Sequence, residues 1–241
     1  PAALTRAAAR GRLVPFLAML SRLEHPALPT LYAAGGERGL YYLATAQIQG
    51  DPLVKRLARG SPVGDREGLE FALKVATALA QLGQRFTYVH GSLTPATLLI
   101  RPDREVGLAD PGLASRLWVA GTPVDAELTS TAVWYLSPEQ LGRGKDPDIR
   151  SDQYALAAVV FHLVTGAPPH KEKTPAEIVR QAAAVVPAPR AQQHNPAVSD
   201  ACDQILARML AGDPRRRFPT WAAAIDALTT ARELASTNML M

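Results

Sequence analysis

The residues with the greatest potential for chemistry lie between positions 88 and 112. Residues 88–100 contain His90, Ser92 and Thr97 but no carboxylate, and Asp110 follows in the turn Asp110-Pro111-Gly112. A carboxylate is well suited to accept a proton from a substrate hydroxyl or to hold a magnesium ion. Such chemistry in this part of the chain would therefore depend on Asp110.

The composition is that of a globular protein with a mild positive charge. The 241 residues are 47% hydrophobic and 20% charged, enough for one large domain or two small lobes. No apolar run reaches the ~18 to 20 residues of a membrane span, and the first residues lack the apolar centre of a signal peptide. We expect a cytoplasmic protein, free or tethered to a membrane protein or complex. A net charge of +4 gives little reason to expect nucleic-acid binding.

Hydrophobic periodicity predicts one helix and two strands in the first fifty residues. Apolar residues recur three and four positions apart over 5–23, as in a helix that buries one face. Strands are expected over 28–32 and 40–45, joined through a turn at Gly35-Gly36.

The rest of the chain is mainly helical in pattern. Helices are expected over 51–60, 66–84, 148–164, 199–211 and 220–235, with another beginning at Thr174 and short strands at 97–100 and 105–109. The helix at 148–164 is apolar nearly all round, which predicts burial on every side.

Residues 88–100 resemble the catalytic loop of protein kinases, H-R-D-L-x-x-x-N. His90, Leu93 and Pro95 stand where that loop would have them. In a working loop the Asp accepts the proton of the substrate hydroxyl, and the Asn holds the second magnesium ion. The Arg, Asp and Asn positions of the loop are occupied here by Gly91, Ser92 and Thr97.

Further stretches resemble bacterial serine/threonine kinases. Asp110 has the place of the magnesium-binding Asp of the D-F-G motif, and residues 131–140 are close to the T-A-x-Y-L-S-P-E-Q that ends the activation segment. Asp152 has the place of the Asp that holds the catalytic loop backbone. The resemblance also implies a buried ion pair between Glu139 and Arg217.

The resemblance implies an α+β, protein kinase-like fold with a mainly helical C-lobe and a truncated N-lobe of helix C plus two or three strands. The implied division is 1–50 for the partial N-lobe and hinge, 51–235 for the helical C-lobe and 236–241 for a tail. No Gly-rich loop or ATP-binding Lys is recognised. The position of the helix C Glu falls at or near Phe16.

The missing loop residues predict a pseudokinase, a domain that is not an enzyme and acts as a binding, scaffolding or regulatory module. No cofactor is expected, because Mg–ATP binding through Asp110 would be residual at most. Two alternatives stay open. One is a structural subunit of a larger assembly, and the other is a weakly active, nucleotide-binding atypical kinase.

The expected partner is a protein: another subunit, a signalling kinase or an upstream part of the same polypeptide. We expect it to bind the apolar face of the first helix, because an apolar patch left exposed commonly marks an interface. This face consists of Leu13, Phe16, Leu17 and Leu20. Candidate phosphorylation sites in the activation segment are Thr129, Ser130 and Thr131.

Overall fold

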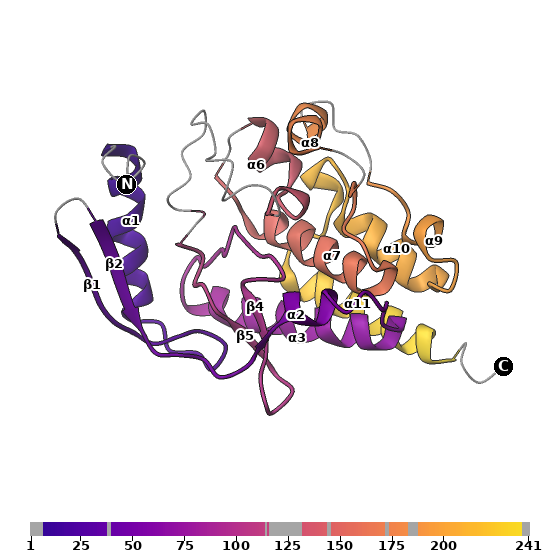
Figure 1. Ribbon diagram of the computed structural model, residues 1–241, viewed down its shortest axis with the longest axis horizontal. Coiled ribbons are helices and arrows are strands. Elements are labelled where there is room, and N and C mark those ends of the chain that lie inside the picture. Colours follow the sequence, from indigo (N-terminus) through magenta and orange to yellow (C-terminus); the bar gives the residue numbers. More distant parts are fainter. Residues whose placement is uncertain are drawn as a thin grey trace.

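The computed structural model describes residues 7–37, 40–113, 115, 132–143, 146–171, 174–182 and 188–237. The first part is a small unit in which one helix stands beside a two-stranded hairpin (Figure 1). Its elements are α1 (Ala7–Leu20), β1 (Leu31–Glu37) and β2 (Leu40–Thr45). The predicted helix and two strands are therefore present, although the first strand covers 31–37 and not 28–32.

The hairpin differs from the prediction in the position of its turn. Gly35 and Gly36 lie inside β1, where they pair with Tyr42 and Tyr41 of β2. The ring of Tyr42 lies so close over Gly35 that a Cβ atom there would come within 2.6 Å of it. The glycine thus provides space for a cross-strand ring, and the predicted turn at Gly35-Gly36 is wrong.

A second, three-stranded sheet follows in the order β3-β4-β5, with both neighbouring pairs antiparallel. Its strands are β3 (Asp51–Pro52), β4 (Leu98–Ile100) and β5 (Val106–Leu108). The short helix α2 (Leu53–Leu57) begins directly after β3. β4 and β5 confirm the two short strands predicted on either side of residues 101–104.

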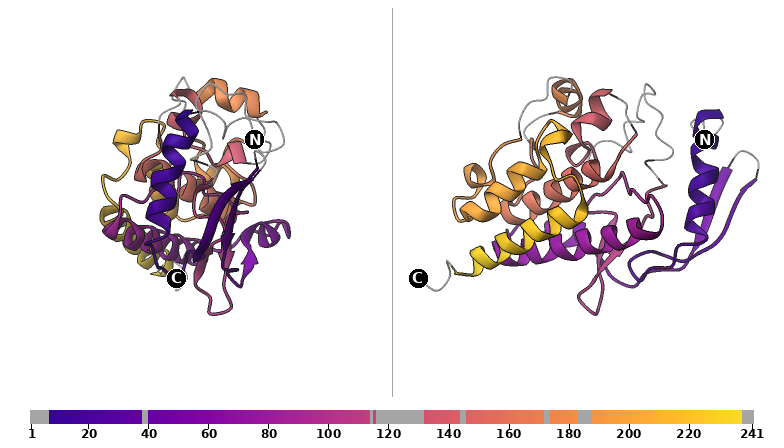
Figure 2. Two further views of the ribbon diagram at one scale, coloured as in Figure 1. Left: turned by 90° about the vertical axis from the view of Figure 1, so that its left-hand side faces the viewer. Right: turned by 180° about the vertical axis from the view of Figure 1, so that it is seen from behind.

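The helical body packs around one central helix. Its elements are α3 (Asp65–Arg85), η1 (Ala132–Trp134), α6 (Pro138–Arg143), α7 (Ile149–Thr165), α8 (Pro175–Ala182), α9 (Ala191–His194), α10 (Asp200–Met209), η2 (Pro214–Arg216) and α11 (Trp221–Thr237). α3 and α11 lie side by side, and α7 also packs against α3 and α10 (Figures 1 and 2).

Helix α7 is buried on nearly every side, as its sequence predicts. Buried residues occupy every position from Ser151 to Phe161. A capping box between Asp148 and Ser151 begins the helix, and Gly166 ends it with φ +82°. α7 thus places Asp152, in its first turn, at a fixed point of the interior.

The apolar face of α1 is covered, contrary to the expectation that it would be only partly buried. Leu13, Phe16 and Leu20 are 8%, 5% and 6% exposed, and Leu17 is half-buried. Phe16 and Leu20 belong to the continuous hydrophobic core, together with Leu23, Ala27 and Leu28 from the connection that follows α1. The exposure on which the predicted interface depended is therefore absent at Leu13, Phe16 and Leu20.

The C-terminal helix extends further than expected. α11 continues to Thr237, so the first two residues of the predicted tail, 236 and 237, are helical.

Among the described residues, no helix is both long and apolar enough to cross a membrane.

Candidate functional site

The loop His90–Thr97 is held in place by a carboxylate from α7. Asp152 Oδ2 accepts the backbone N–H of His90 at 2.8 Å, and Oδ1 accepts that of Gly91 at 2.6 Å. Asp152 is 1% exposed, so these charge-assisted bonds lie in the interior. The contact that the resemblance implied for Asp152 is therefore present.

The side chain of His90 connects the loop to the turn at Asp110. His90 Nε2 lies 2.8 Å from the backbone oxygen of Asp110. Because a carbonyl oxygen can only accept, we assign the proton to Nε2. The other ring nitrogen, Nδ1, lies 3.3 Å from both the backbone nitrogen and the Oγ of Ser92. In the neutral ring, Nδ1 is then the acceptor of both Ser92 donors.

Gly91 has a backbone conformation that explains the residue type at this position. Its φ of +71° lies in the left-handed region, and a Cβ atom would come within 2.7 Å of Pro147 and 2.8 Å of Ser115. Gln140 Nε2 donates to the carbonyl of Gly91 at 2.8 Å. An Arg would not fit here without rearrangement of these neighbours.

Thr97 directs its hydroxyl back into its own loop. Thr97 Oγ1 accepts the N–H of Thr94 at 2.9 Å and donates toward the carbonyl of Thr94 at 3.1 Å. Its distance to the carbonyl of Ser92 is 3.4 Å. The hydroxyl thus stabilises the turn of the loop.

Asp110 uses one carboxylate oxygen to close its own turn. Its Oδ1 accepts the N–H of Gly112 at 3.0 Å and that of Leu113 at 2.9 Å. Gly112 has φ +93°, and a Cβ atom there would come within 2.4 Å of the carbonyl oxygen of His90. The glycine of the Asp-Pro-Gly turn is therefore required for contact with the loop.

The described residues do not form a magnesium site held by the protein alone. No three His, Cys, Asp or Glu side chains gather in a metal-binding arrangement within the described ranges. Thr97 is turned inward, and Asp110 already uses Oδ1 for backbone contacts. Magnesium in proteins is usually held by one or two carboxylates together with waters and substrate phosphates, so a magnesium ion here would depend on Asp110 and on the phosphates of a bound nucleotide.

Glu139 and Arg217, 78 residues apart, form the ion pair that the resemblance implied. The pair is bidentate, with Nη1–Oε1 and Nη2–Oε2 distances of 2.7 and 2.9 Å. Burial alone would raise the pKa of Glu139, but the hydrogen bond and charge of Arg217 outweigh it, so the pKa is lowered. Ser151 also donates to Glu139 at 2.8 Å. This pair ties α6 to the segment between η2 and α11.

The segment that precedes α6 is anchored to α7 through an aromatic pair. Tyr135 Oη lies 2.7 Å from His162 Nδ1, and the two rings stack. Burial, together with the charge of Lys171, lowers the pKa of His162 to about 4. Burial raises the pKa of Tyr135 above its ordinary value. The predicted phosphorylation sites Thr129, Ser130 and Thr131 lie outside the described residues.

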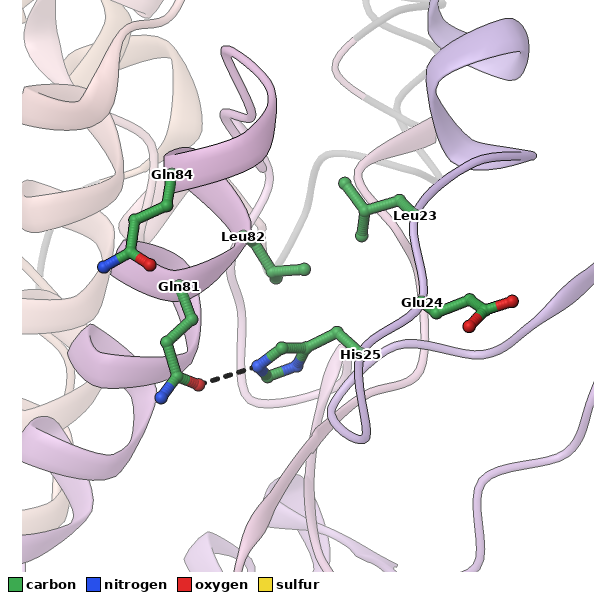
Figure 3. Close-up of a pocket in the computed structure, with 6 residues that line it drawn as sticks. All are labelled: Leu23, Glu24, His25, Gln81, Leu82 and Gln84. Carbon is green, nitrogen blue, oxygen red and sulfur yellow. Dashed lines mark hydrogen bonds between the residues drawn. The ribbon is translucent and has the colours of Figure 1, made fainter.

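A pocket of about 240 Å³ lies apart from this loop, between the end of α3 and the chain that follows α1 (Figure 3). It is lined by Leu23, Glu24, His25, Gln81, Leu82 and Gln84. His25 spans it, with Nε2 2.8 Å from Gln81 Oε1 and Nδ1 accepting the N–H of Ala27. Nε2 thus joins the small unit to α3, whereas Nδ1 bonds within the connection that follows α1.

Three residues that hold the loop were not assigned from the sequence. Ser115 Oγ contacts the carbonyls of His90 and Gly112 at 2.9 and 2.8 Å, and Tyr88 Oη donates to the carbonyl of Pro111 at 2.9 Å. The third is Gln140, which donates to the carbonyl of Gly91. Of the three, only Gln140 could have been found from the sequence, because it ends the S-P-E-Q stretch.

Comparison with known proteins identifies the family. Residues 12–228 match the protein kinase domain family. The chain is 30% identical over 200 residues to the serine/threonine-protein kinase PrkC of Bacillus subtilis, covering 83% of this chain and 30% of PrkC. It is 33% identical over 208 residues to the serine/threonine-protein kinase PknF of Mycobacterium tuberculosis, covering 81% of this chain and 42% of PknF. The chain thus spans well under half the length of these relatives.

A solved structure supports the same assignment. The crystal structure of the Mycobacterium tuberculosis PknI kinase domain superposes with a TM-score of 0.72 at 26% identity, covering 96% of this chain and 82% of that chain. The kinase-like fold predicted from the sequence is confirmed. The prediction that the chain is not an enzyme is overturned, because relatives that match most of the chain are serine/threonine kinases. This chain belongs to the protein kinase domain family.

Proposed function

We propose that the chain is an atypical bacterial serine/threonine kinase domain that transfers a phosphoryl group from a nucleoside triphosphate to a Ser or Thr hydroxyl at a reduced rate. The observation that carries the proposal is the loop backbone, which Asp152 and Gln140 hold through His90 and Gly91. Phosphoryl transfer depends mainly on positioning and charge stabilisation, and positioning is what this arrangement provides.

The residue types in the loop set the expected rate. Ser92 stands where kinases have the Asp that accepts the proton. A general base contributes about 10² to 10⁴-fold. Ordinary protein kinases turn over at about 1 to 100 s⁻¹. We therefore expect the turnover of this chain to be lower than theirs by up to the contribution of the general base.

The test is direct phosphorylation of a Ser- and Thr-rich peptide by the purified chain with Mg–ATP, followed by mass spectrometry over hours. Asp152→Asn, purified identically, is the matched control, because it weakens the hold on the loop and also reports any contaminating kinase. Phosphopeptide that forms with the wild-type chain and falls sharply with Asp152→Asn supports the proposal. No product above blank with the wild-type chain, or equal product with both proteins, contradicts it.

A further inference from the structure

The loop contains a serine hydroxyl in contact with an imidazole whose tautomer is fixed. His90 is fully buried and Ser92 is half-buried. Nε2 of His90 donates to the backbone oxygen of Asp110, which leaves Nδ1 to accept from Ser92 Oγ at 3.3 Å. An activated hydroxyl needs a base beside it and a third group that orients the base. Here the hydroxyl is that of Ser92, the base is His90 and the orienting group is the backbone oxygen of Asp110.

The surroundings fix this geometry from both sides. The backbone N–H of Ser92 also points to His90 Nδ1, so the loop itself keeps Ser92 against the ring. Asp152 holds the backbone of His90, and Ser115 holds its carbonyl. The contact of 3.3 Å is long for a hydrogen bond to a hydroxyl, and catalytic contacts are often long before substrate binds.

We propose that Ser92 and His90 together replace the missing carboxylate, with Ser92 relaying the proton of the substrate hydroxyl to His90. This inference rests on the proposed function. The substrate oxygen forms a bond to the γ-phosphorus while the bond from that phosphorus to the bridging oxygen breaks, and nucleoside diphosphate leaves. The substrate proton passes to Ser92 Oγ as the Ser92 proton passes to His90 Nδ1. After product release, the proton returns through Ser92 to solvent.

His90 is the positioning residue of this relay, and conservative variants separate its two contacts. In His90→Gln, the side-chain amide can still donate to the backbone oxygen of Asp110, but no acceptor remains at the place of Nδ1. Ser92→Ala removes the relay, Ser92→Thr keeps a hydroxyl, and Ser92→Asp provides a carboxylate that needs no second group.

The experiment measures single-turnover transfer from ATP to a Ser/Thr peptide by the 241-residue chain and these variants. Ser92→Ala and His90→Gln should each lower the rate constant by about 10² or more. The double variant should be no slower than either one, since both remove the same relay. Ser92→Thr should retain most of the rate. Ser92→Asp with His90→Gln should transfer as fast as Ser92→Asp alone.

Several results would overturn the relay while leaving the proposed function in place. The first is a wild-type rate in Ser92→Ala, and the second is additive losses in the double variant. The third is a loss of rate when His90→Gln is added to Ser92→Asp, because that result would make the role of His90 purely structural. If His90→Gln does not fold by circular dichroism, the Ser92→Ala and Ser92→Thr pair decides alone. A wild-type chain without any transfer contradicts both the relay and the proposed function.

Discussion

Two neighbouring regions of the site differ in how their polar groups are bonded. The first, here called the frame, consists of Asp152, Glu139, Gln140 and Arg217. Its side chains make contacts across 49 to 78 residues of sequence. The second region is the loop 92–97, where the hydroxyls of Ser92 and Thr97 bond to atoms within five residues of themselves.

The difference shows which contacts the fold depends on. A buried ion pair between distant elements is costly to break, since either partner alone is an unpaired buried charge. A hydroxyl that bonds within its own turn can replace another side chain without moving the elements around it. The frame can therefore persist while the residues that perform chemistry change.

The largest loss of stability is expected for Arg217→Ala. Glu139 would then be a buried carboxylate without its cation, at a cost of about 3 to 5 kcal/mol in the free energy of unfolding. Urea denaturation measures this change in the free energy of unfolding. Arg215→Ala is the control, because Arg215 is exposed and pairs with Asp213 beside it. The denaturation midpoint of this variant should equal that of the wild-type chain. Equal midpoints for both variants would show that the frame does not depend on this pair.

A smaller loss is expected for Asp152→Asn. The amide keeps one acceptor oxygen and places an NH₂ group against the second backbone N–H, so one charge-assisted bond is lost, worth about 1.5 to 3 kcal/mol. Asp226→Asn on the exposed face of α11 serves as the control. Thermal unfolding should separate the two variants. Wild-type stability in Asp152→Asn would remove Asp152 from the frame.

Gly91→Ala tests the link between the frame and the loop. The left-handed φ and the close approach of Pro147 and Ser115 predict a loss of about 1 to 3 kcal/mol. Gly83→Ala in α3 is the matched control, since a Cβ atom there meets nothing within 4 Å. It should raise stability by up to about 1 kcal/mol. A loss at Gly83 or none at Gly91 would contradict the geometry.

The last stability prediction, whose effect vanishes at neutral pH, concerns the Tyr135–His162 pair. The pKa of His162 in the folded chain is about 4, below the ordinary value near 6.5, because of burial and Lys171. The unfolded chain therefore binds more protons between these values, so stability is full above about pH 6.5 and falls as the pH drops toward 4. In His162→Gln this part of the pH dependence should be weaker. Identical profiles of unfolding free energy against pH for His162→Gln and the wild-type chain, from pH 7 to 4, would contradict this prediction.

The resemblance of ordered motifs to bacterial serine/threonine kinases predicted two contacts of the frame, that of Glu139 with Arg217 and that of Asp152 with the loop backbone, but not the contact of Gln140. These two contacts were implied by the family resemblance, and the structure brings both pairs together. The apolar pattern of α7 predicted its burial. These features are set by the fold as a whole, and the motifs identify the fold.

Features that depend on local packing were not predictable. The turn signal at Gly35-Gly36 was misleading, because the Tyr42 ring lies across Gly35. Periodicity predicted that the first helix buries one face, but not that Phe16 and Leu20 join the core that forms after the chain turns back. Nothing in the sequence indicates the φ of Gly91 or the contact between Ser92 and His90, since both result from the path of the loop.

The central claim is that the frame holds the loop ready for phosphoryl transfer, and that the side chain at position 92 limits the rate. The most direct measurement compares single-turnover phosphoryl transfer by Ser92→Asp and Ser92→Ala. The account predicts that Ser92→Asp is faster by about 10² to 10⁴-fold, with wild type between them. Equal rates in both variants, or no transfer by Ser92→Asp, would contradict it.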